Sequence, residues 1–231
     1  MTTSRNLQCG AALLEEKDGE GAAQFGITEA SHSRINFEDN YPDINQFKVE
    51  FAFRTTTPNG MIWIWASYKS YTRYFFLNLV NGLLQLEIIT LTLQAKGHKA
   101  PKILVYKSEK LNNGKWRNVR IQKQDREILI KVGAYPAQSM KDAPSAKVMR
   151  KRMYVGGVIS RHRKQFNLTV PAFSGCIRDF TVDDIPRDLF ASQRDVIPCA
   201  VASKSVYVHE GGYMTFGKSD FMFFFCKTMV L

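Results

Sequence analysis

The sequence lacks a long apolar segment. No run approaches the roughly 18 apolar residues that a membrane-spanning helix requires, so no membrane span is expected. Residues 1–6 also lack the apolar core of a secretory signal peptide. Because the C-terminus looks cut short as well, we interpret the chain as a fragment or a partial gene model and give the absent signal peptide little weight.

Cysteine and histidine are scarce. The 231 residues include four Cys and four His, with no Cys-x-x-Cys pair and no His beside a Cys. This spacing does not suit a zinc site, whose ligands usually come in close pairs. The scattered histidines likewise suggest no catalytic centre. The prediction is therefore that the protein has no cofactor of this kind.

Catalytic motifs are missing too. The sequence contains no nucleophile elbow, P-loop or metalloprotease motif. Glu16, Asp18 and Glu20 repeat the E-x-D-x-E spacing that places three carboxylates on one face of a strand, as glycoside hydrolysis requires. Here Lys and Gly intervene and the flanks are rich in Gly and Ala, so no strand is expected to hold the three acids. The prediction is that the chain is not an enzyme.

Positive charge is abundant but confined to one part of the chain. The net charge is +11. Residues 96–164 contain nineteen Lys and Arg against four Asp and Glu, whereas the segments before and after them are slightly acidic. Such a patch implies a polyanionic partner: a sulfated glycan, a nucleic acid or an anionic membrane surface.

Strand-forming residues dominate the rest. Hydrophobic residues make up 45% of the chain and aromatic residues 12%, which favours strands. Residues 46–54 alternate apolar and polar side chains with period two. Further strands are predicted over residues 61–66, 74–79, 83–89, 115–122, 127–132, 153–155 and 173–182. Short strands between turns, with no convincing helix, indicate a sandwich or barrel.

Four residues have more specific local predictions. Asn81 and Gly82 favour a type I′ hairpin turn, because both tolerate positive φ. Trp116 is predicted to point inward. Gly175 is predicted to lie where another backbone approaches closely.

Six motifs occur in a characteristic order. They are QFGITEASHSRINF (24–37), FKVEFAFRTTTPNGMIWIWAS (47–67), YFFLNLVNGLLQLEI (74–88), NNGKWRNVRIQK (112–123), MYVGGV (153–158) and FSGCIRDFTVDD (173–184). Together they resemble the laminin G-like (LNS) domains, most closely the C-terminal G domains of laminin α chains. The last motif is the most specific, because it matches the F-x-G-C-I-R signature that closes these domains.

The resemblance implies an all-β fold: an antiparallel jelly-roll β-sandwich of the concanavalin A-like, laminin G-like type over residues 23–199. Residues 1–22 are then a linker, and residues 200–231 a linker and the truncated start of a second such domain. Cys176 and Cys199 correspond to the family's disulfide, which requires an oxidising compartment. Cys9 and Cys226 lie outside the match. They pair with each other, pair with parts of a longer chain, or remain free.

Many members of the family bind Ca²⁺ at the rim of the sandwich through two acidic or amide side chains and backbone carbonyls. The resemblance places Arg73 and Val148 at the two side-chain positions. Neither can replace a carboxylate. The prediction is that this chain binds no metal at that rim.

The same rim is basic instead. The candidate glycan-binding residues form two clusters, Lys147, Arg150, Lys151 and Arg152, then Arg161, Arg163 and Lys164, with His162 inside the second. Clustered Arg offers bidentate contacts to sulfate or carboxylate. Aromatic residues suited to base stacking are not interleaved with these charges, which disfavours nucleic acid. The alternative is a merely solvated charged face.

These observations predict a secreted extracellular-matrix or basement-membrane adhesion module that binds heparan sulfate or sulfatide. Cell-surface receptors and the other laminin chains of a full-length protein are further expected partners. Asn167 begins an Asn-Leu-Thr sequon in a loop, so it is a candidate N-glycosylation site. The runner-up function is a structural spacer that binds no glycan.

Overall fold

The computed structural model describes residues 21–37, 42–66, 73–90, 101–141, 143 and 152–199, and Ala22–Pro198 form one compact unit. The strands are β1 Ala23–Phe25, β2 His32–Asn36, β3 Gln46–Arg54, β4 Gly60–Ala66, β5 Arg73–Val80, β6 Leu83–Thr90, β7 Lys102–Tyr106, β8 Arg117–Gln124, β9 Glu127–Val132, β10 Gln138–Met140, β11 Arg152–Val155, β12 Gly175–Val182, β13 Ile185–Pro186, β14 Gln193–Arg194 and β15 Ile197–Pro198. One helix, α1, spans Ser160–Gln165.

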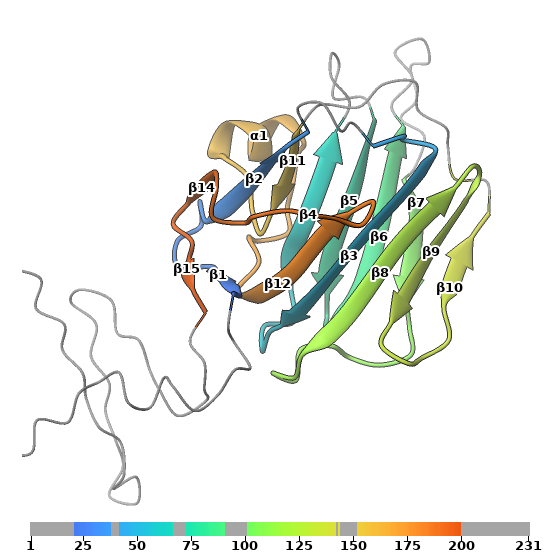
Figure 1. The fold of residues 1–231 in the computed structure, drawn as a ribbon, viewed down its shortest axis with the longest axis horizontal. Helices are drawn as coiled ribbons and strands as arrows, with labels where there is room; N and C mark the ends of the chain where they lie inside the picture. Colours follow the sequence, from blue (N-terminus) through green and yellow to red (C-terminus); the bar gives the residue numbers. More distant parts are fainter. Residues whose placement is uncertain are drawn as a thin grey trace, which may run out of the picture. The chain divides into compact units, whose positions relative to one another are not determined.

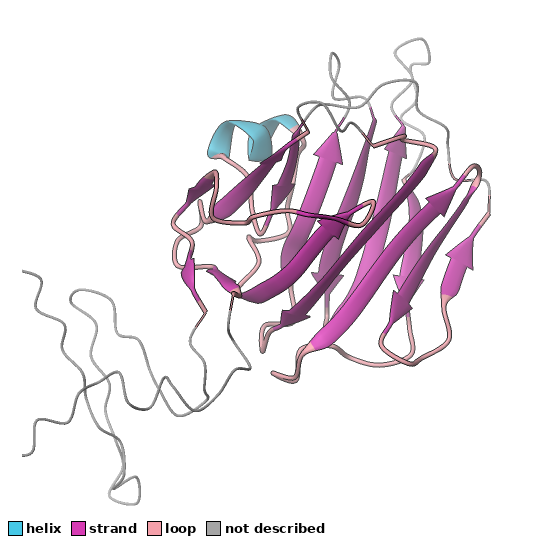
Figure 2. Ribbon diagram, viewed as in Figure 1, coloured by secondary structure: helices cyan, strands magenta, loops and turns pink. Residues whose placement is uncertain are grey.

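The described strands form two antiparallel sheets that lie face to face (Figures 1 and 2). The first sheet has the order β10-β9-β8-β3-β12-β1-β15, with β13 paired to β12. The second has the order β14-β2-β11-β4-β5-β6-β7. Strands that are neighbours in a sheet are often distant in sequence, as in β3 beside β12. The predicted all-β antiparallel sandwich is confirmed.

The core lies between the two sheets and follows from the period-two pattern. In β3, Phe47, Val49, Phe51 and Phe53 are buried, whereas the residues between them include the half-buried Lys48 and Glu50. Phe47 packs edge-on against Trp65 of β4, with ring centroids 5.4 Å apart. Because large aromatic side chains bury the most apolar area, such contacts account for much of the cohesion between the sheets.

The predicted hairpin is confirmed. Asn81 and Gly82 join β5 to β6 with φ of 53° and 81°, and Val80 pairs with Leu83 across the turn. Positive φ at both central residues defines the type I′ turn, whose twist matches that of the strands.

The prediction for Gly175 is also confirmed. Its φ is +150°, and a Cβ atom there would lie 2.4 Å from the backbone oxygen of Arg54. A backbone atom of the neighbouring strand cannot move aside as a flexible side chain can, so β3 and β12 pair at this point only because residue 175 has no side chain.

The expectation that the chain forms no helix is wrong. Helix α1 covers part of the outer face of the second sheet, where a smaller apolar cluster forms around Met61, Ile64, Phe76, Tyr154 and Phe166. The bulge in the pairing of β4 with β5 leaves Trp63 in the main core and Ile64 under the helix. This second apolar face is what gives a six-residue helix a place to pack.

The inward orientation predicted for Trp116 is wrong. Trp116 precedes β8 and is half-buried, with the guanidinium carbons of Arg54 and Arg178 5.0 and 4.3 Å from the centre of its indole ring. Arg54 and Arg178 come from β3 and β12, which are neighbouring strands of the first sheet. The two cations are favourable partners for an electron-rich ring, so the outer face of the sheet provides the packing that the core was expected to provide.

Candidate functional site

Helix α1 carries the second predicted basic cluster. Arg161 and Lys164 are exposed, whereas His162 and Arg163 are half-buried. The ring of His162 lies 5.2 Å from that of Tyr154 in β11, which places the helix against that strand (Figure 1). Basic side chains in its last turn also complement the negative end of the helix dipole.

Arg163 is directed toward the protein rather than toward solvent. Its Nη1 donates to the backbone oxygens of Leu168 at 3.2 Å and Val170 at 2.7 Å. Both bonds hold the loop that follows the helix, and Leu168 and Val170 pack against the apolar cluster beneath it. Of the three predicted glycan-binding residues in this cluster, Arg161 and Lys164 are thus the two that face outward.

The first basic cluster falls largely outside the described residues. Only Arg152 of that cluster is described; it begins β11, is exposed, and pairs in the sheet with Asn36. Lys147, Arg150 and Lys151 lie outside the described residues, as does Val148 of the family's calcium position. Arg73 begins β5. Among the described residues, no group of three or more His, Cys, Asp or Glu side chains is arranged to hold a metal.

Asn167 lies just after α1 and is exposed, with φ of 51°. Its backbone nitrogen donates to the oxygen of Lys164 at 3.1 Å. Asn is among the few residues that adopt this left-handed conformation readily. The sequon residue is therefore held at the end of the helix with its side chain accessible.

Cys176 and Cys199 are both disulfide-bonded. Strand β1 lies between the segments that contain them, since Gln24 pairs with Cys176 on one side and with Ile197 on the other. Their pairing with each other stays a prediction. Cys9 and Cys226 lie outside the described residues.

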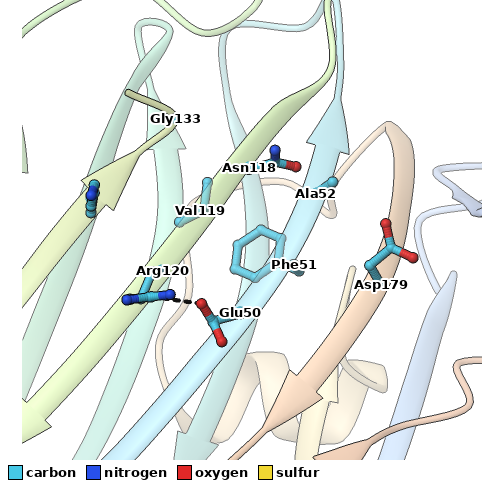
Figure 3. Close-up of a pocket in the computed structure, with 9 residues that line it drawn as sticks. Glu50, Phe51, Ala52, Asn118, Val119, Arg120, Gly133 and Asp179 are labelled. Atoms are coloured by element: carbon cyan, nitrogen blue, oxygen red, sulfur yellow. Dashed lines mark hydrogen bonds and ion pairs between the residues drawn. The ribbon is translucent and has the colours of Figure 1, made fainter. Parts of the chain in front are cut away.

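A hollow of about 350 Å³ opens on the outer face of the first sheet (Figure 3). It lies across β9, β8, β3 and β12, and sequence analysis did not anticipate it. Its lining residues are Glu50, Phe51, Ala52, Asn118, Val119, Arg120, Lys131, Gly133 and Asp179. The floor is low because two short side chains, Ala52 and Asn118, stand opposite each other in the β3–β8 register.

Charged groups of both signs surround this hollow. Arg120 Nε donates to Glu50 Oε1 at 2.6 Å, and Lys131 stands beside Arg120 in the next strand. On the far side, a bulge in β12 between Arg178 and Thr181 turns Asp179 out with φ of 54°. Bulges of this kind redirect single side chains, and no sequence pattern marked this one.

A second hollow of about 350 Å³ lies on the same face of the sheet. Its lining includes Lys48, Gln122, Lys123, Asp183 and Asp184. Lys48 Nζ lies 2.6 Å from Asp184 Oδ1, and its backbone nitrogen donates to Asp183 Oδ1 at 2.7 Å. Burial raises the pKa of Asp183, and the bond from Lys48 partly opposes that rise. The polar groups of this second hollow are thus largely paired within the protein.

Two antiparallel sheets packed face to face, with a basic helix on the outer face of the second sheet, define a β-sandwich module of jelly-roll type. The family model of the laminin G domain matches residues 53–185. The chain belongs to the laminin G domain family, so the resemblance predicted from its motifs is confirmed. The laminin G domain family is one of non-enzymatic modules.

Two laminin chains are similar in sequence. The chain is 24% identical over 195 residues to a laminin subunit alpha of Drosophila melanogaster, which covers 75% of the chain and 5% of that protein. It is 28% identical over 210 residues to human laminin subunit alpha-1, which covers 87% of the chain and 6% of that protein. The chain therefore spans only a small part of the length of these relatives.

Solved laminin structures have the same fold. Domains LG4-5 of the mouse laminin alpha1 chain superpose with a TM-score of 0.67 at 22% identity, over 78% of this chain and 47% of that one. The LG1-3 region of the laminin alpha2 chain gives a TM-score of 0.60 at 17% identity, over 78% of this chain and 34% of that one. Within the described residues, no helix is long and apolar enough to cross a membrane.

Proposed function

We propose that this laminin G domain is a secreted adhesion module of the extracellular matrix or basement membrane, and that it binds sulfated glycans through the basic edge formed by α1 and the start of β11. The observation that supports this most directly is the exposure of Arg161 and Lys164 on α1, a helix that packs against β11, where Arg152 is exposed too. Heparan sulfate and sulfatide are the expected ligands. Cell-surface receptors and other laminin chains are further proposed partners.

A polyanion suits this edge for electrostatic reasons. A single exposed ion pair contributes only about 0 to 1 kcal/mol, so one sulfate would bind weakly. A chain of sulfates can contact several cations at once, and Arg adds a planar fork that donates two parallel hydrogen bonds. Lys147, Arg150 and Lys151 belong to the same proposed surface by their sequence position.

Calcium is not part of the proposal. Arg73 and Val148 stand where the family's acidic or amide ligands are expected, and a hard cation requires oxygen ligands. We therefore propose that glycan binding persists in EDTA.

The remaining predictions from the sequence are also part of this proposal. Residues 23–199 are the domain, with a linker at residues 1–22 and the start of a second domain at residues 200–231. Cys176 pairs with Cys199, as an oxidising extracellular compartment allows. Asn167 carries an N-glycan when the chain is secreted.

The test is retention on heparin-agarose in a salt gradient with EDTA present. We compare the wild type with Arg161→Ala/Lys164→Ala, and with the control pair Lys107→Ala/Lys110→Ala, which removes the same charge from exposed residues after β7. The wild type and the control are expected to elute well above physiological salt, and the α1 variant near it. Screening by salt acts on all exposed charges alike, so a difference between the two pairs identifies the surface.

The spacer alternative makes the opposite prediction. If the wild type elutes early, the basic edge is only solvated and the domain separates other parts of a longer chain. If both variants lose retention equally, binding follows net charge and the proposed edge is wrong.

A further inference from the structure

The hollow on the outer face of the first sheet has features that the basic edge lacks. It mixes acceptors and donors: the carboxylates of Glu50 and Asp179, the amide of Asn118, and the cations of Arg120 and Lys131 (Figure 3). Its volume of about 350 Å³ lies at the lower end of the range for small-molecule sites. A ligand here would be small and polar.

The size of the hollow can be compared with that of a sugar ring. Since a water molecule takes up about 30 Å³ in the liquid, the hollow holds roughly a dozen waters. A ligand with about that many non-hydrogen atoms is of the size of one sugar ring with its substituents.

The charges around the hollow further restrict the class of ligand that it can bind. Arg178 Nε lies 3.5 Å from Asp179 Oδ2, and Lys48 Nζ lies 3.4 Å from Glu50 Oε2. Both carboxylates of the hollow are thus partly neutralised by neighbouring cations, so Arg120 and Lys131 favour a ligand with one acidic group. Glu50 and Asp179 repel a densely sulfated chain, but a carboxylate accepts hydrogen bonds from hydroxyl groups.

We propose that this hollow binds a single sugar ring that bears one carboxylate. The carboxylate lies between Arg120 and Lys131, and the ring hydroxyls donate to Glu50 and Asp179. Arg120 is suited to this role because its bond to Glu50 fixes the side chain while 47% of it stays exposed. A side chain held in place beforehand loses less conformational freedom when the ligand binds.

This site is separate from the basic edge in residues and in ligand. The hollow uses β3, β8, β9 and β12 of the first sheet, whereas α1 packs on the outer face of the second. The inference goes beyond the proposed function and does not depend on it.

The experiment is an NMR titration of the full chain with methyl β-glucuronide, with methyl β-glucoside as the matched probe without the carboxylate. About a dozen atoms at ordinary ligand efficiency give a dissociation constant on the order of 1 mM. We expect the glucuronide to shift the backbone amide signals of Ala52, Asn118 and Lys131, and the glucoside to bind at least about tenfold more weakly.

Three variants locate the site. Asn118→Trp fills the hollow from an exposed strand position that tolerates aromatic residues. Lys131→Met removes the cation. Lys107→Met removes the same charge outside the hollow. The first two are expected to weaken glucuronide binding at least about tenfold, and the third to leave it unchanged, with dispersed spectra showing that each variant is folded.

The proposal is wrong if the glucoside binds as well as the glucuronide, if Asn118→Trp leaves binding intact, or if the shifted signals belong to α1. Arg161→Ala/Lys164→Ala separates it from the proposed function. Loss of heparin retention in that variant with glucuronide binding intact supports both sites. A wild type that binds glucuronide but not heparin refutes the proposed function alone.

Discussion

Lys123 is the least expected of the buried residues. It lies in β8 among core-facing positions and is 1% exposed. Its Nζ donates to the backbone oxygen of Asp125. Burial lowers the pKa of Lys123, and the charges of Asp125 and Asp43 partly oppose that change. A positive charge on Lys123 is therefore less favourable here than in water.

This shift predicts a pH-dependent stability. The pKa of Lys123 is lower in the folded chain than in the unfolded chain, so the unfolded chain binds more protons between the two pKa values and the free energy of unfolding rises with pH there. Lys123→Met should stabilise the protein at pH 7 by up to about 1 kcal/mol. That advantage should shrink as the pH approaches 10.5.

Urea unfolding at pH 7 and near pH 10 measures this effect. The control is Lys131→Met on the neighbouring strand, where the side chain is exposed. It measures the effect of removing one positive charge without removing a buried side chain. A stability difference for Lys123→Met that stays constant or grows with pH would contradict a lowered pKa of Lys123 in the folded chain.

At the level of single residues, sequence reasoning succeeded where the backbone alone decides. Gly175 was identified because only backbone geometry matters at such a position. Trp116 was misplaced because an indole packs equally well in a core or between two guanidinium groups. The choice depended on Arg54 and Arg178, which are separated by more than a hundred residues in sequence.

At the level of elements, helix α1 divides its basic residues between two tasks. Arg163 bonds to the backbone oxygens of Leu168 and Val170, whereas Arg161 is exposed. Hydrogen bonds from a charged donor contribute about 1.5 to 3 kcal/mol. Substitutions at exposed positions usually change stability by less than about 0.5 kcal/mol.

The two residues should therefore respond differently to substitution. Arg163→Ala should lower the free energy of unfolding by about 2 kcal/mol, because it frees the loop after the helix. Arg161→Ala should leave stability unchanged and reduce heparin retention. Chemical denaturation measures the first effect and the salt gradient the second. Equal stability of the two variants would show that Arg163 does not hold the loop.

Elements were predicted well where a pattern repeats within one segment. The alternation in β3 and the Asn81–Gly82 turn are local signals, and both are confirmed. Helix α1 gave no such signal: it has six residues, an Ile at the N-cap and no side-chain cap. Its formation depends on the apolar cluster around Ile64 and Tyr154, which exists only after β4 and β11 have paired.

At the level of the whole molecule, the candidate sites were only partly predictable. The excess charge of residues 96–164 pointed to one basic surface. In the fold, Arg120 and Lys131 lie on the outer face of the first sheet, and Arg161 and Lys164 lie on α1. The order of strands in the sheets separated them, and a charge count along the sequence contains no information on that order.

The C-terminal end of the domain is held by few strand contacts. Within the described part of the chain, the two residues of β15 pair with β1 alone, and the two residues of β14 pair with β2. A disulfide between Cys176 and Cys199 would tie this end to β12. Closing a ring of about 23 residues restricts the unfolded chain and contributes about 3 kcal/mol.

Cys199→Ser should therefore lower the free energy of unfolding by about 3 kcal/mol. Cys9→Ser should leave it unchanged, because Cys9 precedes the domain. A non-reducing peptide map should show the segments around Cys176 and Cys199 joined. If Cys9→Ser costs as much as Cys199→Ser, a terminal cysteine is the partner. In that case Cys176 and Cys199 do not form a disulfide with each other. Strands β14 and β15 are then held mainly by their short pairings with β2 and β1.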